Sequence, residues 1–340
     1  MKYTLLGNTG LKVSELCLGT MGFGTEWNWG ADYETSQKIL NMYIEAGGNF
    51  IDTANLYTEN SSEKFLGEML HGNRHDMVLA TKYALRENRA NKNINASGNN
   101  RKSLMYNVEQ SLKRLRTDYI DLLYLHAWDG LTPIDEVMRG LDDLVSQGKV
   151  NYLGISDTPA WVVAQGQTLA QYTGLTKFAT LQVEYSLLQR TPERELIPMM
   201  QHFGMTLTPW APLAGGALTG KYLKGDKGRL PEESTRLNER SVSITKEVLK
   251  ISEETGFSPS HVALRWVMQK PYNSIPIIGA TKPHQLEDNL NAINVSLTNE
   301  HIVRLNAISA IEMGFPHDFL LGDGVKDILY SGQYDNIKRR

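Results

Sequence analysis

Short apolar runs of strand length recur eight times along this chain, and longer segments with helical periodicity separate them. Several of those segments open on Pro, Ser or Thr at a cap position, as in 103–116, 133–147 and 259–269. Alternating apolar strands and helices are typical of a parallel sheet covered by helices, and the count favours a closed (β/α)₈ TIM barrel over an open doubly wound sheet. We expect the strands at 14–20, 49–53, 77–81, 119–125, 151–156, 178–184, 205–210 and 273–279.

The segment before the first expected barrel strand, residues 2–13, alternates around Asn8-Thr9-Gly10, which predicts an N-terminal β-hairpin that plugs the bottom of the barrel. Two long βα loops break the regular spacing. The Asn-rich loop at roughly 84–101 follows the third strand, and the loop at roughly 214–240 follows the seventh. Such loops face the active site of a barrel, so both are candidate substrate lids or cofactor clasps, although 84–101 is equally explained as a mobile surface loop.

No linker divides the sequence, so we expect a single domain over 1–340. The tail, 314–340, is expected to lie against the barrel or over the site, and the sequence leaves both open. The formal net charge of −3, without a basic stripe, argues against nucleic acid as a partner. A single cysteine, Cys17, excludes an internal disulfide framework, and its apolar surroundings predict a buried, inert thiol.

The N-terminus lacks the apolar core of a signal peptide, and nowhere do 18 apolar residues run together. We therefore expect a soluble, cytoplasmic protein without a membrane partner. Monomer and homo-oligomer both remain open.

Polar side chains end six consecutive expected strands. Each one alone has an ordinary structural explanation, but together they would converge on the catalytic face of a barrel. These residues are Asp52, Lys82, His126, Ser156 with Asp157, Gln182 with Glu184, and Trp210.

Tyr57, five positions after Asp52, is the expected proton donor. A tyrosine near its ordinary pKa of about 10 donates poorly at neutral pH, but a nearby ammonium favours the phenolate and lowers that pKa. Lys82 would supply the ammonium, and Asp52 would keep it charged and oriented. His126 would donate a ring N–H to the oxygen that Tyr57 protonates.

These motifs resemble the aldo-keto reductase superfamily, in particular its bacterial-type NADP-dependent members. The resemblance covers nearly the whole chain in the order that the family shows. It rests on GGNFIDTANLYTENSSEKFLGEML (47–70), ATKY (80–83), LLYLHAWD (122–129), YLGISD (152–157), LQVEYSLLQR (181–190), TPWAPLAGGALTGKY (208–222) and IPIIGATKPHQLEDNL (275–290).

The resemblance implies a (β/α)₈ barrel that binds NADP(H) in extended form, with hydride passing directly between the nicotinamide and a carbonyl or alcohol carbon. It places Asp52, Tyr57, Lys82 and His126 on the family's catalytic tetrad. Ser156 and Gln182 would bind the carboxamide, and Trp210 would stack on the nicotinamide. The full set of implied cofactor contacts is Thr20, Met21, Asp52, Ser156, Asp157, Gln182, Trp210, Ala211, Pro212, Leu213, Gly215, Lys221, Gly279, Ala280, Thr281, Lys282, Gln285, Asp288 and Asn289.

Two positions depart from the family pattern. Asp157 stands where many members have Asn beside the carboxamide-binding serine, so it contacts the amide nitrogen or not at all. Gln285 stands where many NADPH-preferring members have Arg, which leaves Thr281 and Lys282 as the evident partners of the 2′-phosphate. We expect NADP(H) as the preferred cofactor, with NAD(H) use left open.

Aromatic residues near the strand ends suit a small-molecule substrate with a flat or apolar body, such as an aromatic aldehyde, a quinone or a bulky ketone. These candidates are Phe23, Trp27, Trp29 and Trp128. Arg86, Asp129 and the 84–101 loop offer an alternative, the binding of sugar hydroxyls.

Two other classes of function compete with a reductase. One is a cofactor-binding redox sensor of the potassium-channel β-subunit type, with little turnover. The other is a metal-dependent hydrolase that uses Asp52, His126 and Glu184. The chain lacks a paired-histidine motif on its first strand, and Lys82 would repel a metal, so we expect no metal site.

Overall fold

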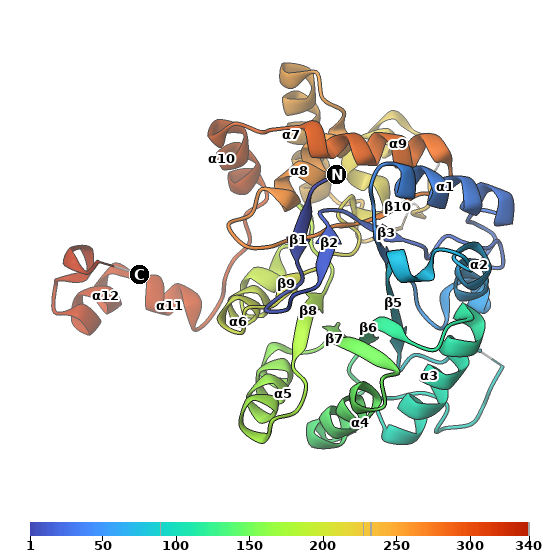
Figure 1. The fold of residues 1–340 in the computed structure, drawn as a ribbon. Helices are drawn as coiled ribbons and strands as arrows, with labels where there is room; N and C mark the ends of the chain where they lie inside the picture. Colours follow the sequence, from blue (N-terminus) through green and yellow to red (C-terminus); the bar gives the residue numbers. More distant parts are fainter. Residues whose placement is uncertain (89, 227, 232, 339–340) are drawn as a thin grey trace.

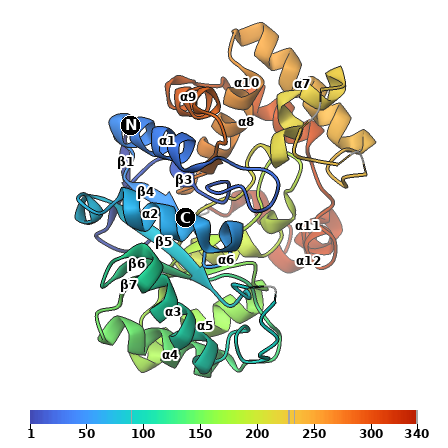
Figure 2. The same cartoon turned by 90° about the vertical axis from the view of Figure 1, so that its right-hand side faces the viewer.

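The computed structural model describes residues 1–88, 90–226, 228–231 and 233–338. Within these residues, eight parallel strands form one sheet that curls into a barrel (Figures 1 and 2). Each strand overlaps one of the expected ranges, so the (β/α)₈ barrel is confirmed. In sheet order the strands are β10 (Ile277–Gly279), β3 (Cys17–Gly19), β4 (Phe50–Asp52), β5 (Val78–Tyr83), β6 (Ile120–Leu125), β7 (Val150–Ser156), β8 (Phe178–Gln182) and β9 (Thr206–Leu207).

Backbone hydrogen bonds join β9 to the segment that leads into β10 and so close the barrel. Leu207 N donates to Asn273 O at 3.0 Å, and Ile275 N donates to Leu207 O at 2.8 Å. Closure leaves no free sheet edge and brings the carboxyl ends of all the strands to one face.

Helices follow the strands and pack on the outside of the sheet (Figures 1 and 2). The segments expected to be helical at 103–116, 133–147 and 259–269 form α3, α4 and α8, and the side chains of Asn100 and Ser258 cap α3 and α8. The helices of the barrel are α1 (Tyr33–Glu45), α2 (Ser61–Met69), α3 (Arg101–Leu115), α4 (Ile134–Ser146), α5 (Ala160–Thr173), α6 (Leu196–His202), α7 (Glu239–Thr255), α8 (Pro259–Met268) and α9 (Pro283–Asn291).

The N-terminal hairpin closes the amino-terminal end of the barrel, as expected. β1 (Tyr3–Leu5) pairs antiparallel with β2 (Lys12–Ser14). Leu6 and Val13 are fully buried in the cluster that fills the barrel interior, which also holds Cys17. Gly7 N donates to Thr206 Oγ1 at 2.7 Å, which fixes the hairpin to β9.

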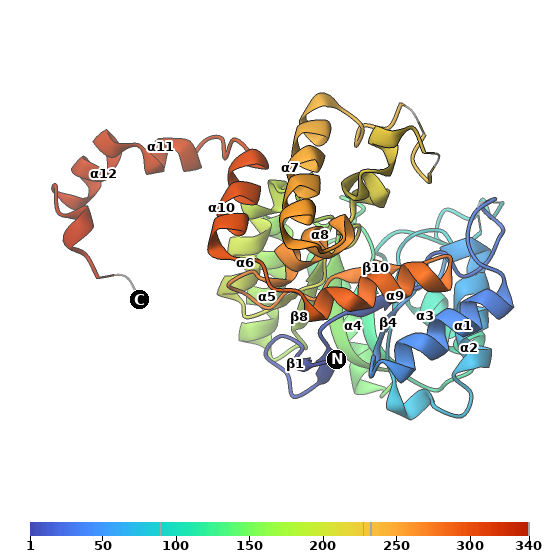
Figure 3. The same cartoon turned by 90° about the horizontal axis from the view of Figure 1, so that it is seen from above.

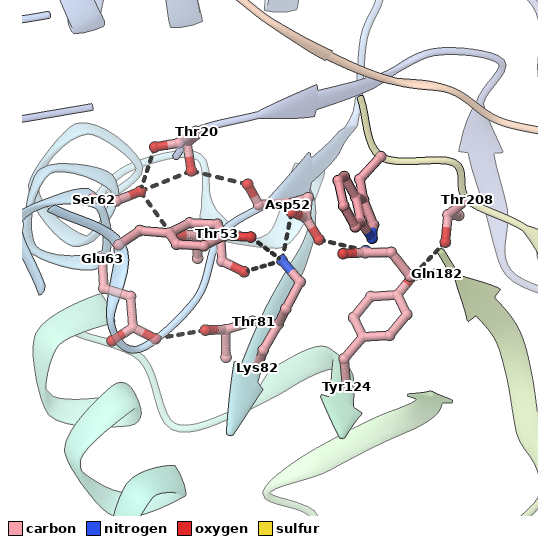
Figure 4. Close-up of polar contacts among 12 residues, drawn as sticks. Thr20, Asp52, Thr53, Ser62, Glu63, Thr81, Lys82, Tyr124, Gln182 and Thr208 are labelled. Atoms are coloured by element: carbon pink, nitrogen blue, oxygen red, sulfur yellow. Dashed lines mark hydrogen bonds and ion pairs between the residues drawn. The ribbon is translucent and has the colours of Figure 1, made fainter. Parts of the chain in front are cut away.

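Gly154, in the middle of β7, makes room for a tyrosine inside the barrel. A Cβ at this position would lie 2.4 Å from Tyr124 Cε1. Tyr124 fills that space and hydrogen-bonds through its hydroxyl to Thr208 Oγ1 at 3.0 Å (Figure 4). A glycine within a strand therefore marks a close approach here, not a weak strand.

Both long loops leave the carboxyl-terminal face of the barrel. In the first, between β5 and α3, Asn99 exchanges hydrogen bonds with Asp129: Asn99 N donates to Asp129 Oδ2 at 2.8 Å, and Asp129 N donates to Asn99 Oδ1 at 2.7 Å. The second joins β9 to α7 and contains the short turns η4 (Ala214–Thr219) and η5 (Lys221–Lys224). Asp129 thus anchors a loop, which removes the basis for its expected role toward sugar hydroxyls.

The described part of the C-terminal segment, residues 314–338, neither covers the site nor lies along the barrel, which corrects both expectations for the tail; residues 339 and 340 lie outside the described residues. After α10 (Asn299–Ile308) it projects away from the barrel as α11 (His317–Leu321) and α12 (Asp323–Tyr330) (Figures 1 and 3). Across the described residues, none of the helices is both long enough and apolar enough to pass through a membrane.

Candidate active site

Lys82, on β5, is the centre of a buried polar cluster at the strand ends. Its side chain is 0% exposed, and Figure 4 shows it pointing toward Asp52 and Thr53. Nζ lies 2.6 Å from Asp52 Oδ2, 2.8 Å from Thr53 O and 3.1 Å from Tyr57 OH. An ammonium carries three protons, so each proton has an acceptor, which offsets the cost of burying the charge.

Asp52, at the end of β4, uses both carboxylate oxygens. Oδ2 accepts from Lys82, and Oδ1 accepts from Gln182 Nε2 at 2.8 Å (Figure 4). The sequence did not predict this second bond, which commits the amide nitrogen of Gln182 to Asp52 and leaves its oxygen for another partner.

The charge states of the pair follow from burial and proximity. Burial lowers the pKa of Lys82, but Asp52 and Tyr57 more than reverse this and raise it above the usual value, so the ammonium persists at neutral pH. Loss of water raises the pKa of Tyr57, and the Lys82 charge only partly opposes this. The expected net lowering of the Tyr57 pKa is therefore wrong, because burial is the larger effect. The phenol is protonated at neutral pH, as a proton donor must be.

His126, directly after β6, lies across from Tyr57. The two ring centroids are 5.9 Å apart with an interplanar angle of 82°. Burial, assisted by the Lys82 charge, lowers the pKa of His126 well below its ordinary range, so its imidazole is neutral. Its Nδ1, and the Oγ of Ser156 at the end of β7, are buried without a hydrogen-bond partner within the described part of the chain. Buried polar atoms left in this way mark positions where a bound molecule would complete the hydrogen bonding.

The residues after Tyr57 form a left-handed turn that sequence reasoning missed. Residues 58–60 have φ values of 45°, 52° and 77°, a conformation that costs about 1–3 kcal/mol for each non-glycine residue. The hydroxyl of Thr58 holds the turn by donating to Phe23 O at 2.5 Å. These three residues follow the expected proton donor directly. Their strained conformation indicates that the surrounding structure holds the backbone here and so positions the Tyr57 hydroxyl.

A buried ion network braces the same region, and no local sequence signal could have revealed it. Glu63 on α2 accepts from Thr81 Oγ1 at 2.6 Å and from Arg114 Nε at 2.6 Å. Arg114 also binds Glu87, in the loop after β5, at 2.8 Å. The network joins α2, α3 and the residue before Lys82.

Trp210, after β9, contacts Asp157. The indole Nε1 donates to Asp157 Oδ1 at 3.2 Å, and Asp157 itself has a φ of 39°. The carboxylate at this unusual position therefore orients the aromatic ring that was expected to stack on a nicotinamide.

The loop after Trp210 turns tightly. Ala211, Gly215 and Gly216 have φ values of 51°, 68° and 89°. A Cβ on Gly216 would lie 2.8 Å from Lys221 Nζ, so the lysine amine reaches back over the turn. Within the same stretch, Pro212 is buried and Leu213 half-buried. Small residues allow a close backbone approach here, and Lys221 adds positive charge.

The start of α9 is a candidate position for an anion. The helix begins at Pro283 without a side-chain cap, and Lys282 is exposed just before it. Gln285 Oε1 accepts from Thr281 N at 3.0 Å and from Thr281 Oγ1 at 3.3 Å, so both groups already have a partner. Gly279, at the end of β10, is exposed, and Ala280 is buried.

Four expected contact residues are buried or hydrogen-bonded within the protein. Thr20 is fully buried, and its Oγ1 lies 2.9 Å from Asp52 O and 2.8 Å from Ser62 Oγ (Figure 4). Asp288 pairs with His261 on α8, 3.0 Å from its Nε2, and Asn289 turns toward Gly279 O at 3.4 Å. Phe23 is fully buried in the core, so its expected contact with substrate is wrong. Packing and strand-end hydrogen bonds explain these placements.

The remaining candidates sit on loops at the strand ends. Trp27 and Trp29 are half-buried with ring centroids 6.0 Å apart, and Met21 is half-buried in the same loop. Trp128 lines a cavity of about 520 Å³ together with Leu131 and Trp161, and no tetrad residue lines that cavity. Within the described residues, no three His, Cys, Asp or Glu side chains are grouped to hold a metal.

The strand ends of this parallel barrel bring the Asp52 carboxylate, the Lys82 ammonium and the Tyr57 phenol into one hydrogen-bonded series. Comparison with known proteins gives the family. The model of the aldo/keto reductase family matches residues 15–310. The chain therefore belongs to the aldo/keto reductase family, whose members are oxidoreductases acting on carbonyl or alcohol groups.

Three curated relatives are 39–41% identical to this chain over the aligned residues. An aryl-alcohol dehydrogenase (NADP(+)) of Phanerodontia chrysosporium is 41% identical over 93% of this chain and 87% of that protein. A norsolorinic acid reductase of Emericella nidulans is 40% identical over 92% and 82%. A putative aryl-alcohol dehydrogenase of Saccharomyces cerevisiae is 39% identical over 92% and 88%.

Proposed function

We propose that this chain is an NADP(H)-dependent oxidoreductase that reduces aryl aldehydes or ketones and, in reverse, oxidises aryl alcohols. The names of the relatives support the aryl class and the cofactor. Half-buried Trp27, Trp29 and Trp128 on the strand-end loops supply aromatic surface for such a substrate.

The hydrogen-bonded series Asp52, Lys82 and Tyr57 carries the proposal. In reduction, the Tyr57 hydroxyl gives its proton to the carbonyl oxygen. The Lys82 ammonium, 3.1 Å from that hydroxyl, stabilises the phenolate that remains, and Asp52 keeps the ammonium charged. Neutral His126 offers one ring N–H to orient the substrate oxygen.

The residues present fit a nicotinamide dinucleotide, which would supply or accept the hydride. Ser156 Oγ has no hydrogen-bond partner among the described residues, and Gln182 uses its amide nitrogen for Asp52, so both side chains present an oxygen at strand ends where a carboxamide can be bound. Trp210 offers a ring held by Asp157. The turn after Trp210, with Lys221, and the uncapped start of α9, with Lys282, provide two places for phosphate groups.

The test is NADPH consumption with a matched pair of substrates, benzaldehyde and cyclohexanecarbaldehyde, which differ in aromaticity. We expect kcat/KM to be at least about tenfold higher for the aryl aldehyde, which corresponds to about 1.4 kcal/mol of transition-state stabilisation. Equal values would remove the aryl assignment. Binding of NADPH without turnover of any carbonyl would favour the redox-sensor alternative.

The cofactor assignment has its own test. Lys282→Ala should raise the Kd of NADPH about tenfold and leave that of NADH within about twofold, because only NADPH carries the 2′-phosphate. Lys224→Ala, which removes an exposed lysine of η5, is the matched control. Equal weakening of both cofactors by Lys282→Ala would place the phosphate elsewhere.

A further inference from the structure

The C-terminal arm, residues 314–338, carries a large apolar surface outside the family-matched region 15–310. All residues of α11 and α12 are described, and none of them is buried. At its root the arm is held by a contact of 2.8 Å between His317 Nε2 and Glu195 Oε1. Its large apolar side chains are exposed as follows: Phe315 85%, Phe319 57%, Leu320 47%, Leu321 56%, Ile328 81%, Leu329 57%, Tyr330 41% and Ile337 47%.

The residue pattern of α12 is typical of a helix that packs one face against another surface. Val325, Ile328 and Leu329 are spaced three and four apart and so share one face, while Asp323, Lys326 and Asp327 have the same spacing on another. Isolated helices shorter than about 12–15 residues are marginal in water. α11 has 5 residues and α12 has 8, so packing against another surface must sustain them.

The size of the apolar surface indicates what that partner is. With about 200 Å² for each large side chain, the exposed fractions of these eight apolar residues add up to on the order of 900 Å². A stable protein–protein interface buries about 800 Å² on each partner. One arm therefore presents the area that one side of a dimer requires.

We propose that the arm pairs with the arm of a second copy of this chain, so that α11 and α12 from both copies form the interface of a twofold homodimer. An apolar face is complementary to itself, and the commonest oligomers are dimers in which the same patch meets on both subunits. The charged face of α12 remains in water in this arrangement. The arm projects from the barrel, so pairing leaves the barrel mouth free (Figure 3).

The first test is sedimentation equilibrium of the full chain over a range of concentrations. We expect a dimer, and Ile328→Asp should raise its dissociation constant at least about hundredfold, because the substitution places a charge in the apolar interface. Tyr172→Asp is the matched control, since Tyr172 on α5 has the same exposure of 81%. It should stay within about twofold of wild type. A wild-type chain that is monomeric throughout, or a dimer insensitive to Ile328→Asp, overturns the proposal.

A second test does not depend on the tolerance of the arm for a charge. The only cysteine, Cys17, is buried, so Ile328→Cys adds the single accessible thiol. Twofold pairing predicts that a short bis-maleimide joins two chains of Ile328→Cys, whereas Tyr172→Cys stays uncrosslinked. Crosslinking of Tyr172→Cys alone would place the interface on α5, and a crosslink in neither variant would mean that the arms do not meet. Neither test depends on catalytic turnover, so failure here leaves the proposed function untouched.

Discussion

Lys82 is central to the proposed chemistry. Its ammonium is buried, and in the described structure Asp52 is its only charged partner within 4 Å. Lys82→Met should lower the free energy of unfolding by about 3–5 kcal/mol, since it leaves the Asp52 carboxylate buried and unpaired. It should also lower kcat and shift the pH profile, because the ammonium no longer stabilises the Tyr57 phenolate.

The double variant Asp52→Leu with Lys82→Met separates these two effects in chemical denaturation. Stability should return in part, because the double variant removes both charges of the Asp52–Lys82 pair, while turnover stays low. An unchanged pH profile in Lys82→Met would mean that Lys82 does not act on Tyr57.

His126 makes stability depend on pH. Its pKa in the folded chain lies well below the ordinary value of about 6.5, so below that pH the unfolded chain binds a proton that the folded chain does not. Well above pH 6.5, protonation of His126 does not favour the unfolded chain. As the pH falls below this value, protonation increasingly stabilises the unfolded chain, and the free energy of unfolding decreases. Between about pH 6.5 and 5.5, wild type should lose up to about 1 kcal/mol more unfolding free energy than His126→Gln. Equal losses of unfolding free energy for wild type and His126→Gln in urea titrations would show that His126 binds its proton as readily in the folded chain as in the unfolded chain.

At the scale of elements, the left-handed turn at 58–60 links the loop after β3 to the proton donor. Thr58→Val keeps the side-chain shape but loses the hydrogen bond to Phe23 O, which should cost about 1–3 kcal/mol of stability. It should also lower kcat and alter the pH profile through a displaced Tyr57. Thr58→Ser keeps the hydroxyl and should restore both. A stability loss with unaltered kcat and pH profile would make the turn merely structural.

The strands, the barrel and the hairpin plug follow from sequence because their signals are local and repeated: eight apolar runs, helical spacing between them, and a turn at Asn8-Thr9-Gly10. The grouping of Asp52, Tyr57 and Lys82 also follows, since parallel strands end at one face. The bond from Gln182 to Asp52, the bond from Trp210 to Asp157 and the burial of Thr20 do not follow. They depend on side-chain directions between strands far apart in sequence.

The direction of the Tyr57 pKa shift could not be predicted from the sequence for a related reason. The sequence identifies Lys82 as the nearby charge, but it does not give the amount of water around the Tyr57 hydroxyl. Burial decides the direction of the shift. The C-terminal arm shows the same limit at larger scale. The apolar spacing of α12 is a local feature of the sequence, but the projection of the arm from the barrel depends on which surfaces the barrel leaves uncovered.

At the scale of the whole molecule, the two ends of the barrel have different roles. The hairpin and the packed interior close one end, and the loops at the other end hold the proposed proton donor and the two proposed phosphate sites. The central claim is that Tyr57, tuned by Lys82, moves the proton while other residues hold the dinucleotide.

Parallel measurement of NADPH binding and benzaldehyde turnover in wild type and Tyr57→Phe tests that claim most directly. The account predicts a Kd for NADPH within about twofold of wild type and a kcat lower by about 10²–10⁴, the usual contribution of a general acid. An undiminished kcat, or a loss of binding as large as the loss of turnover, would contradict it.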